Sequence, residues 1–439
     1  MTPQAIGNAR LEDLTLLDPD IQECPFPLYE RLLAEAPVYF DRKAGFWVIS
    51  RYQDIRQILS DPDAFSSAAS VEFLRDTVAP ERAAMARQIY REKGWEPTPT
   101  LSLQDDPRHK ETRAIFTRAL RAGKINQLDP FIRDTAFDLV AKFKGRGTCD
   151  VIAELAVPLP LIAICSQVGV PVDDIWKIKR WTDAWVKRFS MMQTEQEERA
   201  SIEQEIEFQH YFQPIIEQMR ARPDESILSD LVNFRLSDGS QLEYADIVSH
   251  LLSDLFVGGS ETSTNAIGEG ILMLCQNPGQ YELLMSDLST YLPPFIEEVL
   301  RLQSPVQGLY RVTTREVQIG DAKIPARALL NLRFAAGNRD AAQFSCPSKL
   351  DLDRTNAGSH IAFGSGIHHC IGAPLARREM YWSFEALLQN AANIRLSPGK
   401  NDLSHMPGLM LRALKSLHIE FDPAGHAIVE EAMVAPFLD

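Results

Sequence analysis

The feature that most constrains the fold is a long apolar helix expected near the middle of the chain. Apolar residues recur at helical spacing from Tyr244 to Asn277, and Pro278 ends the pattern because proline lacks the N–H that a helix interior needs. From Pro107 onward the sequence predicts further helices, separated by polar breaks at 171–174, 222–225 and 237–240. Short strands are expected at 46–50, 312–319 and 328–333, with a final pair near 411–421. The sequence therefore predicts a mainly α fold with small β-sheets.

Nothing in the sequence divides the chain. It contains no internal repeat and no linker-like stretch, so we expect a single domain over 1–439 with terminal tails at 1–12 and 422–439. Between 64 and 103 the helical periodicity is lost, and serine, proline and arginine accumulate. Irregular stretches of that length are commonly lids or binding loops. We therefore expect a lid over 64–103.

The charge balance excludes two classes of partner. The 439 residues include 45 Lys and Arg against 60 Asp and Glu, which gives a formal charge of −15. Sequence-independent binding to nucleic acid or to an anionic membrane requires clustered basic residues, and no polybasic tract occurs. The first ten residues lack the pattern of a secretion signal, and the most apolar segment, 151–170, is interrupted by a glutamate and two prolines. We expect a cytoplasmic monomer that binds neither nucleic acid nor membrane.

One of the six cysteines lies in a distinctive segment. The six form no C-x-x-C pair and no zinc-binding spacing, so most are expected to be buried free thiols. Cys370 lies within a glycine-rich run from Phe363 to Arg377, and a helix is expected from about Ala373. The glycines allow the backbone to approach a large flat ligand, and the helix N-terminus should stabilise Cys370 as a thiolate. By itself the run is also compatible with a redox-active cysteine or with a turn beside a core thiol.

The same run resembles the haem-binding signature F-G-x-G-x-H-x-C-x-G-x-x-L-A-R of the cytochrome P-450 family. The resemblance covers about residues 46–421 and implies that family's single-domain fold, with haem b between the long central helix and the cysteine loop. It implies that Cys370 is the axial thiolate ligand of the iron. His368 would bind a haem propionate, and His369 is expected to be structural. The loop around the cofactor would include Phe363, Gly364, Gly366 and Gly372.

A second pair of residues resembles the family's propionate clamp. His109 and Arg113 stand at i and i+4, so both side chains project from one helix face. Such a pair suits an anionic group, although alone it is also typical of a solvated helix face. The resemblance implies that both residues, together with Arg311, bind the haem propionates.

A third pair resembles the family's buried salt bridge. Glu298 and Arg301 stand at i and i+3 on one helix face, and alone an exposed pair of this kind contributes little. The resemblance implies a structural ion pair that supports the core beside the haem. For its third member the sequence has Lys349 where arginine is common, which leaves Arg354 as the candidate.

The central helix carries two glycines that need an explanation. Gly258 and Gly259 each cost about 1 kcal/mol relative to alanine, and Thr262 can bond back to a carbonyl one turn earlier. A helix-packing notch is one explanation. A groove that admits dioxygen beside an acid and an alcohol is another, because heterolytic O–O cleavage requires two protons. The segment resembles the family's (A/G)-G-x-(D/E)-T signature, which implies Thr262 as the oxygen-side hydroxyl and Glu261 as part of the proton route.

The resemblance implies a haem-thiolate monooxygenase that inserts one atom of dioxygen into an apolar substrate. The chain is filled by the haem domain, so electrons from NAD(P)H are expected to arrive through a separate ferredoxin and ferredoxin reductase. A peroxide-driven relative is an alternative within the same class, although the pair Glu261 and Thr262 argues for oxygen activation. A haem-based sensor is the alternative from a different class, and it would need neither the acid and alcohol nor an electron donor.

The substrate is expected to be a hydrophobic small molecule. A terpenoid or steroid fits the apolar character of the expected pocket, and a fatty acid is the alternative because Arg75, Arg82, Arg87 and Arg91 of the lid could meet a carboxylate. By family position the pocket would be lined by Phe256, Val257, Gly258, Val306, Gln307, Gly308, Leu309, Leu409 and Met410.

One short segment carries charge of the opposite sign to the whole chain. Between 107 and 124 there are six basic residues and one acid, Glu111. By resemblance this segment borders the face beneath Cys370, where Arg377 and Arg378 would add charge. We expect an acidic ferredoxin to dock there, because opposed patches accelerate association in a salt-dependent way. The basic residues are Arg108, Lys110, Arg113, Arg118, Arg121 and Lys124.

Overall fold

The computed structural model describes residues 3–73, 80–189 and 192–424, and most of this part of the chain is helical. The sequence predicts this mainly α fold with small sheets. The helices of the first half are α1 (Pro3–Asn8), α2 (Pro19–Glu23), α3 (Phe26–Glu35), α4 (Tyr52–Leu59), α5 (Ala68–Glu72), α6 (Pro80–Lys93), α7 (Arg108–Ala119), α8 (Ala122–Phe143), α9 (Pro158–Val168), α10 (Ile175–Phe189) and α11 (Glu195–Ala221). Those of the second half are α12 (Ile227–Asn233), α13 (Tyr244–His250), α14 (Thr262–Gln276), α15 (Pro278–Ser286), α16 (Leu288–Gln303), α17 (Phe334–Gly337) and α18 (Ala373–Asn390).

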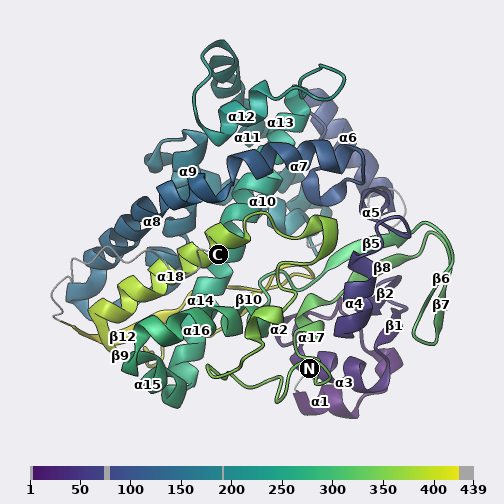
Figure 1. The fold of residues 1–439 in the computed structure, drawn as a ribbon. Helices are drawn as coiled ribbons and strands as arrows, with labels where there is room; N and C mark the ends of the chain where they lie inside the picture. Colours follow the sequence, from purple (N-terminus) through teal and green to yellow (C-terminus); the bar gives the residue numbers. More distant parts are fainter. Residues whose placement is uncertain (1–2, 74–79, 190–191, 425–439) are drawn as a thin grey trace.

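The strands form one five-stranded sheet and three smaller ones. The large sheet has the order β1-β2-β8-β5-β3 and is antiparallel except for the parallel pair β2 and β8. Its strands are β1 (Val38–Asp41), β2 (Phe46–Ile49), β8 (Leu329–Leu332), β5 (Leu309–Thr313) and β3 (Phe65–Ser66). Figure 1 shows the long helices on one side of the molecule and the strands β1, β2, β5 and β8 on the other. The smaller sheets are β4 (Thr148–Asp150) with β12 (His418–Pro423) and β9 (Ala391–Leu396), β10 (His405–Met406) with β11 (Ala413–Leu414), and β6 (Val317–Ile319) with β7 (Ala322–Ile324).

The long apolar helix is present, but its middle is wound differently from its ends. α13, a π-helical segment over Leu251–Glu261 and α14 follow one another without a break. Within this stretch the hydroxyls of Ser260 and Thr262 donate to the carbonyl oxygens of Phe256 and Gly258, at 2.5 and 2.9 Å. Such back-bonding loosens a helix, and π-helical turns are frequent at functional sites. The loosening expected beside the two glycines is therefore confirmed.

The main hydrophobic core surrounds this central helix. Buried side chains of α8, α9, α11, α16 and α18 pack with it into one cluster. Ile267 and Ile271 of α14 are fully buried there. Among the described residues, no helix has the length and hydrophobicity that a membrane span requires.

The region 64–103 is not the irregular lid that we expected. It contains β3, α5, the fourteen-residue helix α6 and a short 3₁₀ turn at Leu101–Leu103, while residues 74–79, including Arg75, lie outside the described residues. Of the residues in α6 only Ala86 and Tyr90 are buried. Apolar periodicity, the main sequence signal for a helix, is correspondingly weak.

Three smaller expectations also need correction. Residues 3–12 are not a loose tail, because Ile6 is buried and Arg31 Nη1 donates to the carbonyls of Ile6 and Ala9 at 2.8 and 2.6 Å. The segment 312–319 contains the end of β5 and all of β6 rather than one strand. Near the C-terminus β11 and β12 do not pair with each other, since each joins a different sheet. The second expected tail begins within β12, and residues 425–439 lie outside the described residues.

Candidate active site

The cysteine loop is held against the end of α4 by a glycine. Gly364 and Gly366 have φ angles of 69° and 68°, in the left-handed region that favours glycine. A Cβ atom at Gly366 would lie 2.2 Å from the carbonyl oxygen of Leu59, which is too close for any residue other than glycine. The backbone N–H of Cys370 donates to the carbonyl of Phe363 at 2.9 Å and closes the loop. The loop therefore delivers Cys370 to the start of α18 in a fixed position.

The thiol of Cys370 does not have the lowered pKa that we expected. Its side chain is exposed on one side, but the protein packed around the others desolvates the sulfur and raises its pKa. The backbone N–H groups of Gly372 and Ala373 and the charge of Arg113 act in the opposite direction. The helix N-terminus thus favours the thiolate as predicted, but burial outweighs it. A coordinated metal cation deprotonates a thiol outright, so a cation bound to the sulfur would offset the effect of burial.

Four predicted contacts for an anionic group lie together beside this loop. The imidazole rings of His109 and His368 are 4.2 Å apart between centroids, and the charges of Arg113 and Arg311 act on His368. Arg113 Nη2 donates to the carbonyl of His369 at 2.8 Å, and His368 Nε2 lies 3.1 Å from the hydroxyl of Ser67. α7, β5 and the cysteine loop supply these residues, which are far apart in sequence. The structure therefore brings the predicted clamp together.

The cluster has hydrogen-bond donors without acceptors. Arg311 is buried, and in the part of the chain that the structure describes its guanidinium has no carboxylate partner and donates only to the carbonyl of Tyr310. Desolvation lowers the pKa of Arg311 to about 10, and desolvation with the neighbouring cations lowers that of His368 to about 3. His109 Nε2 is buried with no hydrogen-bond partner. Such a cluster is stabilised by an anionic ligand.

Glu261 and Thr262 are adjacent in sequence but point to different partners. The Glu261 carboxylate accepts from the hydroxyl of Thr182 at 2.6 Å and from Lys179 Nζ at 3.1 Å, both on α10. Thr262 donates to the carbonyl of Gly258. Sequence reasoning missed Lys179 and Thr182, because nothing in their segment marks them as partners of a residue so far along the chain.

Burial disfavours the charged form of Glu261. Desolvation raises the pKa of Glu261, and the ammonium of Lys179 opposes that rise. Desolvation also disfavours charged Lys179, but Glu261 and Asp183 together raise its pKa. Glu261 is therefore a buried carboxyl group with a perturbed pKa, a property that is common at functional sites.

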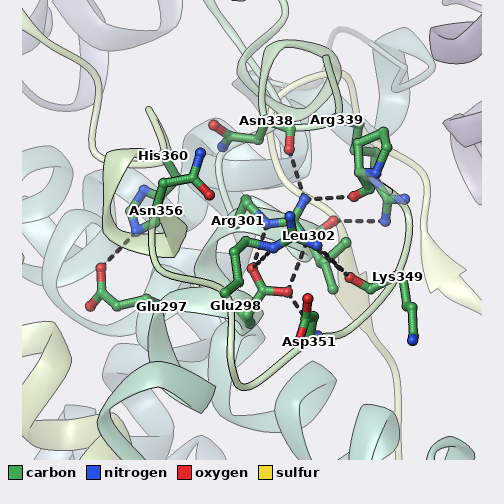
Figure 2. A network of polar contacts seen from close by, with 12 residues as sticks. Glu297, Glu298, Arg301, Leu302, Asn338, Arg339, Lys349, Asp351, Asn356 and His360 are labelled. Carbon is green, nitrogen blue, oxygen red and sulfur yellow. Dashed lines mark hydrogen bonds and ion pairs between the residues drawn. The ribbon is translucent and has the colours of Figure 1, made fainter. Parts of the chain in front are cut away.

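Figure 2 shows the buried network around Glu298 and Arg301. Arg301 binds the Glu298 carboxylate through two N–H groups, at 2.6 and 2.9 Å, and donates to the carbonyls of Asn338 and Lys349 at 3.0 and 3.1 Å. Arg354 Nε lies 3.0 Å from the same carboxylate and is the third member. Lys349 contributes its backbone carbonyl, while its side chain is exposed.

Comparison with known proteins shows to which family a chain with this cysteine loop and cationic cluster belongs. The family model of cytochrome P-450 matches residues 172–416. The chain belongs to the cytochrome P-450 family. Members of this family bind haem b and are monooxygenases, that is, oxidoreductases that incorporate molecular oxygen. Electrons from NAD(P)H, supplied through partner proteins, are typical of the family.

Relatives of known or assigned function align with most of this cytochrome P-450. A vitamin D(3) 25-hydroxylase of Pseudonocardia autotrophica is 31% identical over 91% of this chain and 94% of its own length. A putative cytochrome P-450 of Bacillus subtilis (strain 168), YjiB, is 31% identical over 83% of this chain and 86% of its own. Among solved structures, a cytochrome P-450 from Bacillus megaterium in complex with testosterone is 28% identical and covers 90% of this chain and 99% of its own, with a TM-score of 0.75.

The residues of this cytochrome P-450 fit haem b. Cys370 would hold the iron, and the cationic and imidazole groups of His109, Arg113, Arg311 and His368 would hold the two propionates. Asp106 lies 3.2 Å from His109 Nδ1, which leaves the buried Nε2 atom of the same ring for a propionate. Gly372 leaves space beside the sulfur, because a Cβ atom there would lie 3.9 Å from Cys370 Sγ. Phe363 supports the loop from behind, with the guanidinium of Arg377 4.7 Å from its ring centroid.

One cavity beside the central helix shares little of its lining with the expected substrate pocket. A cavity of about 470 Å³ is lined by parts of α6, α10, α11 and the π-helical segment, and of the nine predicted residues only Leu409 lines it. A larger open hollow of about 800 Å³, beside Cys346 and Lys349, shares no lining residue with the site. A volume of about 470 Å³ is within the usual range of ligand pockets.

Three of the predicted pocket residues are occupied with structural contacts. Phe256 is buried against Phe208 and Phe212. The Gln307 side chain donates to two carbonyls and accepts from the hydroxyl of Tyr29. Gly308 is pressed against the sheet, where a Cβ atom would lie 2.5 Å from the carbonyl oxygen of Leu332. The other predicted residues, Val257, Gly258, Val306, Leu309 and Met410, are outside the cavity lining.

The lid arginines have separate roles. Arg82 and Arg87 line the cavity, whereas Arg91 does not and faces Glu96 at 3.9 Å. Arg82 forms an ion pair with Glu198 of α11 at 2.5 Å. The sequence analysis missed Arg188 and Glu205, which also line the cavity, because α10 and α11 carry charged residues along their whole length.

Proposed function

We propose that this cytochrome P-450 hydroxylates a hydrophobic substrate of terpenoid or steroid size, with electrons delivered by a ferredoxin. The observation that carries the proposal is the pairing of an acid and an alcohol at the distorted step of the central helix. Glu261 is buried at the end of the π-helical segment, against α10, and Thr262 is back-bonded to Gly258. Neither a haem-based sensor nor a peroxide-driven enzyme requires this arrangement.

Some site residues would bind the cofactor, and others would transfer protons. When bound, the haem supplies oxygen activation at an iron that carries a cysteine thiolate ligand. Cys370 holds the iron, and the cluster of His109, Arg113, Arg311 and His368 neutralises and orients the propionates. The Thr262 hydroxyl donates its hydrogen to the carbonyl of Gly258, so its oxygen offers a hydrogen-bond acceptor on the oxygen side. Glu261 supplies protons to that side after its contact with Lys179 and Thr182 breaks.

We propose that the ferredoxin docks on the basic segment 107–124, which contains α7 and the first residues of α8. The charge of this segment is lower than the sequence suggests, because Asp246 pairs with Arg108 at 3.5 Å and Asp230 contacts Arg118 and Lys124 at 3.7 and 3.1 Å. These two aspartates reduce the excess of five positive charges to three. Lys110 and Arg121 are exposed, and within the described residues neither has an ion-pair partner.

Arg377 and Arg378 add less to this surface than expected. Arg377 is paired with Glu297 at 2.6 Å, and Arg378 is buried against Asp129 at 2.7 Å. Their charges are therefore largely neutralised within the protein. The docking proposal depends on Lys110 and Arg121 instead.

Turnover with defined electron donors tests the proposal. The holoenzyme is supplied with NADPH, a surrogate ferredoxin and its reductase, and a panel of steroids and terpenoids, and hydroxylated product is measured by mass spectrometry. We expect product that depends on all three components. Product formed only with hydrogen peroxide would favour the peroxide-driven alternative, and reduction without product across the panel would favour the sensor.

A further inference from the structure

The cavity beside the central helix has charged side chains in its lining. They come from the turn after β1, from α6 and the residues that follow it, and from α10 and α11. The basic residues are Lys43, Arg82, Arg87 and Arg188, and the acidic ones are Glu96, Glu198 and Glu205. Arg82 is paired with Glu198 and Arg188 with Glu205, so the hydrogen bonds that these pairs make decide which donors remain for a ligand.

Glu205 is fully engaged by its neighbours. Arg188 Nη1 donates to both of its carboxylate oxygens, at 2.9 and 2.8 Å, and the hydroxyl of Tyr90 donates to it at 2.5 Å. Arg188 Nη1 also lies 2.6 Å from the Tyr90 oxygen. Glu205 is almost fully buried. It therefore balances the charge of one guanidinium, that of Arg188.

Glu198 does not accept a hydrogen bond from both Arg82 and Arg188. Arg82 Nε lies 2.5 Å from one carboxylate oxygen of Glu198, whereas Arg188 Nε lies 3.7 Å from the other, which is too long for a hydrogen bond. Arg188 Nε is buried and has no hydrogen-bond acceptor. This part of the wall therefore has more donors than acceptors.

The donors remain charged although they are away from bulk water. Desolvation opposes the charge of Arg188, but the carboxylates of Glu205 and Glu198 together raise its pKa above the ordinary value. A guanidinium that keeps its charge and lacks an acceptor at a buried N–H gains a strong hydrogen bond from an added carboxylate.

We propose that the cavity binds the carboxylate of an amphipathic substrate between Arg82 and Arg188. This inference rests on the proposed function and names the substrate class of the same enzyme. Much of the remaining lining is apolar, including Trp185, Phe208 and Leu252, and it surrounds the hydrocarbon body. The same chemistry is present in long-chain fatty acids and in steroid or terpenoid acids. A neutral steroid would leave Arg188 Nε without an acceptor.

Paired ligand titrations of the holoenzyme test the carboxylate. Hexadecanoic acid is compared with its methyl ester, and cholanic acid with its methyl ester, by the absorbance change of the haem spin state. We expect the acid to bind at least ~10-fold more tightly than its ester in one or both pairs, since charge-assisted hydrogen bonds are about twice as strong as neutral ones. The pair with the larger ratio identifies the hydrocarbon body. Equal affinities of acid and ester in both pairs would overturn the proposal.

Two variants and a matched control locate the effect. Arg82→Gln should remove most of the acid preference and leave ester binding unchanged, whereas Glu198→Gln should increase the preference because it removes the competing acceptor. Arg91→Gln makes the same charge change on the same helix outside the cavity, and it should behave as wild type. Equal weakening by Arg82→Gln and Arg91→Gln would indicate general charge attraction and would refute the site.

These outcomes are separate from those of the proposed function. Loss of the acid preference leaves the thiolate spectrum and ferredoxin-dependent turnover intact. A protein that lacks the thiolate spectrum, or that forms no product with any donor, would instead contradict the proposed function.

Discussion

The imidazole of His109 faces that of His368 at 4.2 Å, and this contact joins α7 to the cysteine loop. Both rings are buried deeply enough that desolvation lowers their pKa values. Two neutral imidazoles can lie this close without repulsion and can each donate one N–H. The contact therefore places two propionate donors beside the cysteine before any cofactor binds.

Cys370→Ser tests the iron ligand. The wild-type protein should show the strongly red-shifted Soret band of a thiolate-ligated carbonyl complex after reduction, and the variant should lose it because a hydroxyl is a poor ligand for this purpose. Absorbance difference spectra with carbon monoxide measure the band. Cys275→Ser is the control and should retain it. Persistence of the band in Cys370→Ser would mean that another cysteine holds the iron.

Thr262→Ala tests the proton route. The variant should bind haem and substrate but should divert most reducing equivalents to hydrogen peroxide, because oxygen insertion needs protons at the right moment. Product and peroxide per NADPH oxidised are measured together. Thr262→Ser keeps the hydroxyl and should recover much of the coupling. Unchanged product per NADPH in Thr262→Ala would reduce Thr262 to a packing residue.

Arg354→Ala tests the third member of the buried network. Removing it leaves Glu298 with one cationic partner instead of two, and we expect a loss of about 2 kcal/mol in the free energy of unfolding. Lys349→Ala is the matched control, because Lys349 contributes only its backbone carbonyl and should change stability by less than about 0.5 kcal/mol. Denaturant unfolding of both variants measures the difference. Similar losses in both would contradict the assignment.

Glu379→Gln tests a buried carboxyl group on α18. Burial, only partly offset by the hydroxyl of Ser263, raises the pKa of Glu379 to about 8. Between the unfolded value of 4.5 and about 8 the folded protein holds a proton that the unfolded chain releases, so Glu379 makes stability fall as pH rises through this range. The variant should melt a few degrees higher than wild type at pH 8, and the two should converge near pH 5. A difference in Tm that does not vary with pH would exclude this titration.

The docking surface is tested by salt and by charge reversal. Ferredoxin-supported reduction should fall steeply with ionic strength, and Lys110→Glu or Arg121→Glu should slow it several-fold without changing substrate affinity. Arg118→Glu should have a smaller effect, because Arg118 already contacts Asp230. Lys400→Glu, in the loop between β9 and β10, is the control. Stopped-flow reduction rates that are flat in salt would place the docking surface elsewhere.

The sequence predicted those parts of the site whose signal is local. The cysteine loop, the clamp residues His109 and Arg113 and the step at Gly258 depend on residues a few positions apart, and each has the expected environment apart from the pKa of Cys370. The helix α6 was missed because only two of its side chains are buried. The cavity lining was largely missed because it depends on how α6, α10 and α11 pack together, which no local pattern encodes.

The close approach of Gly366 to Leu59 ties the cysteine loop to a helix from the first part of the chain. A Cβ atom at residue 366 would lie 2.2 Å from the carbonyl oxygen of Leu59, so any side chain there would push the loop away from α4. The position of Cys370 therefore depends on the last turn of α4. A substitution that frays the last turn of α4 would lower haem incorporation in the cell, although it changes no residue that touches the cofactor.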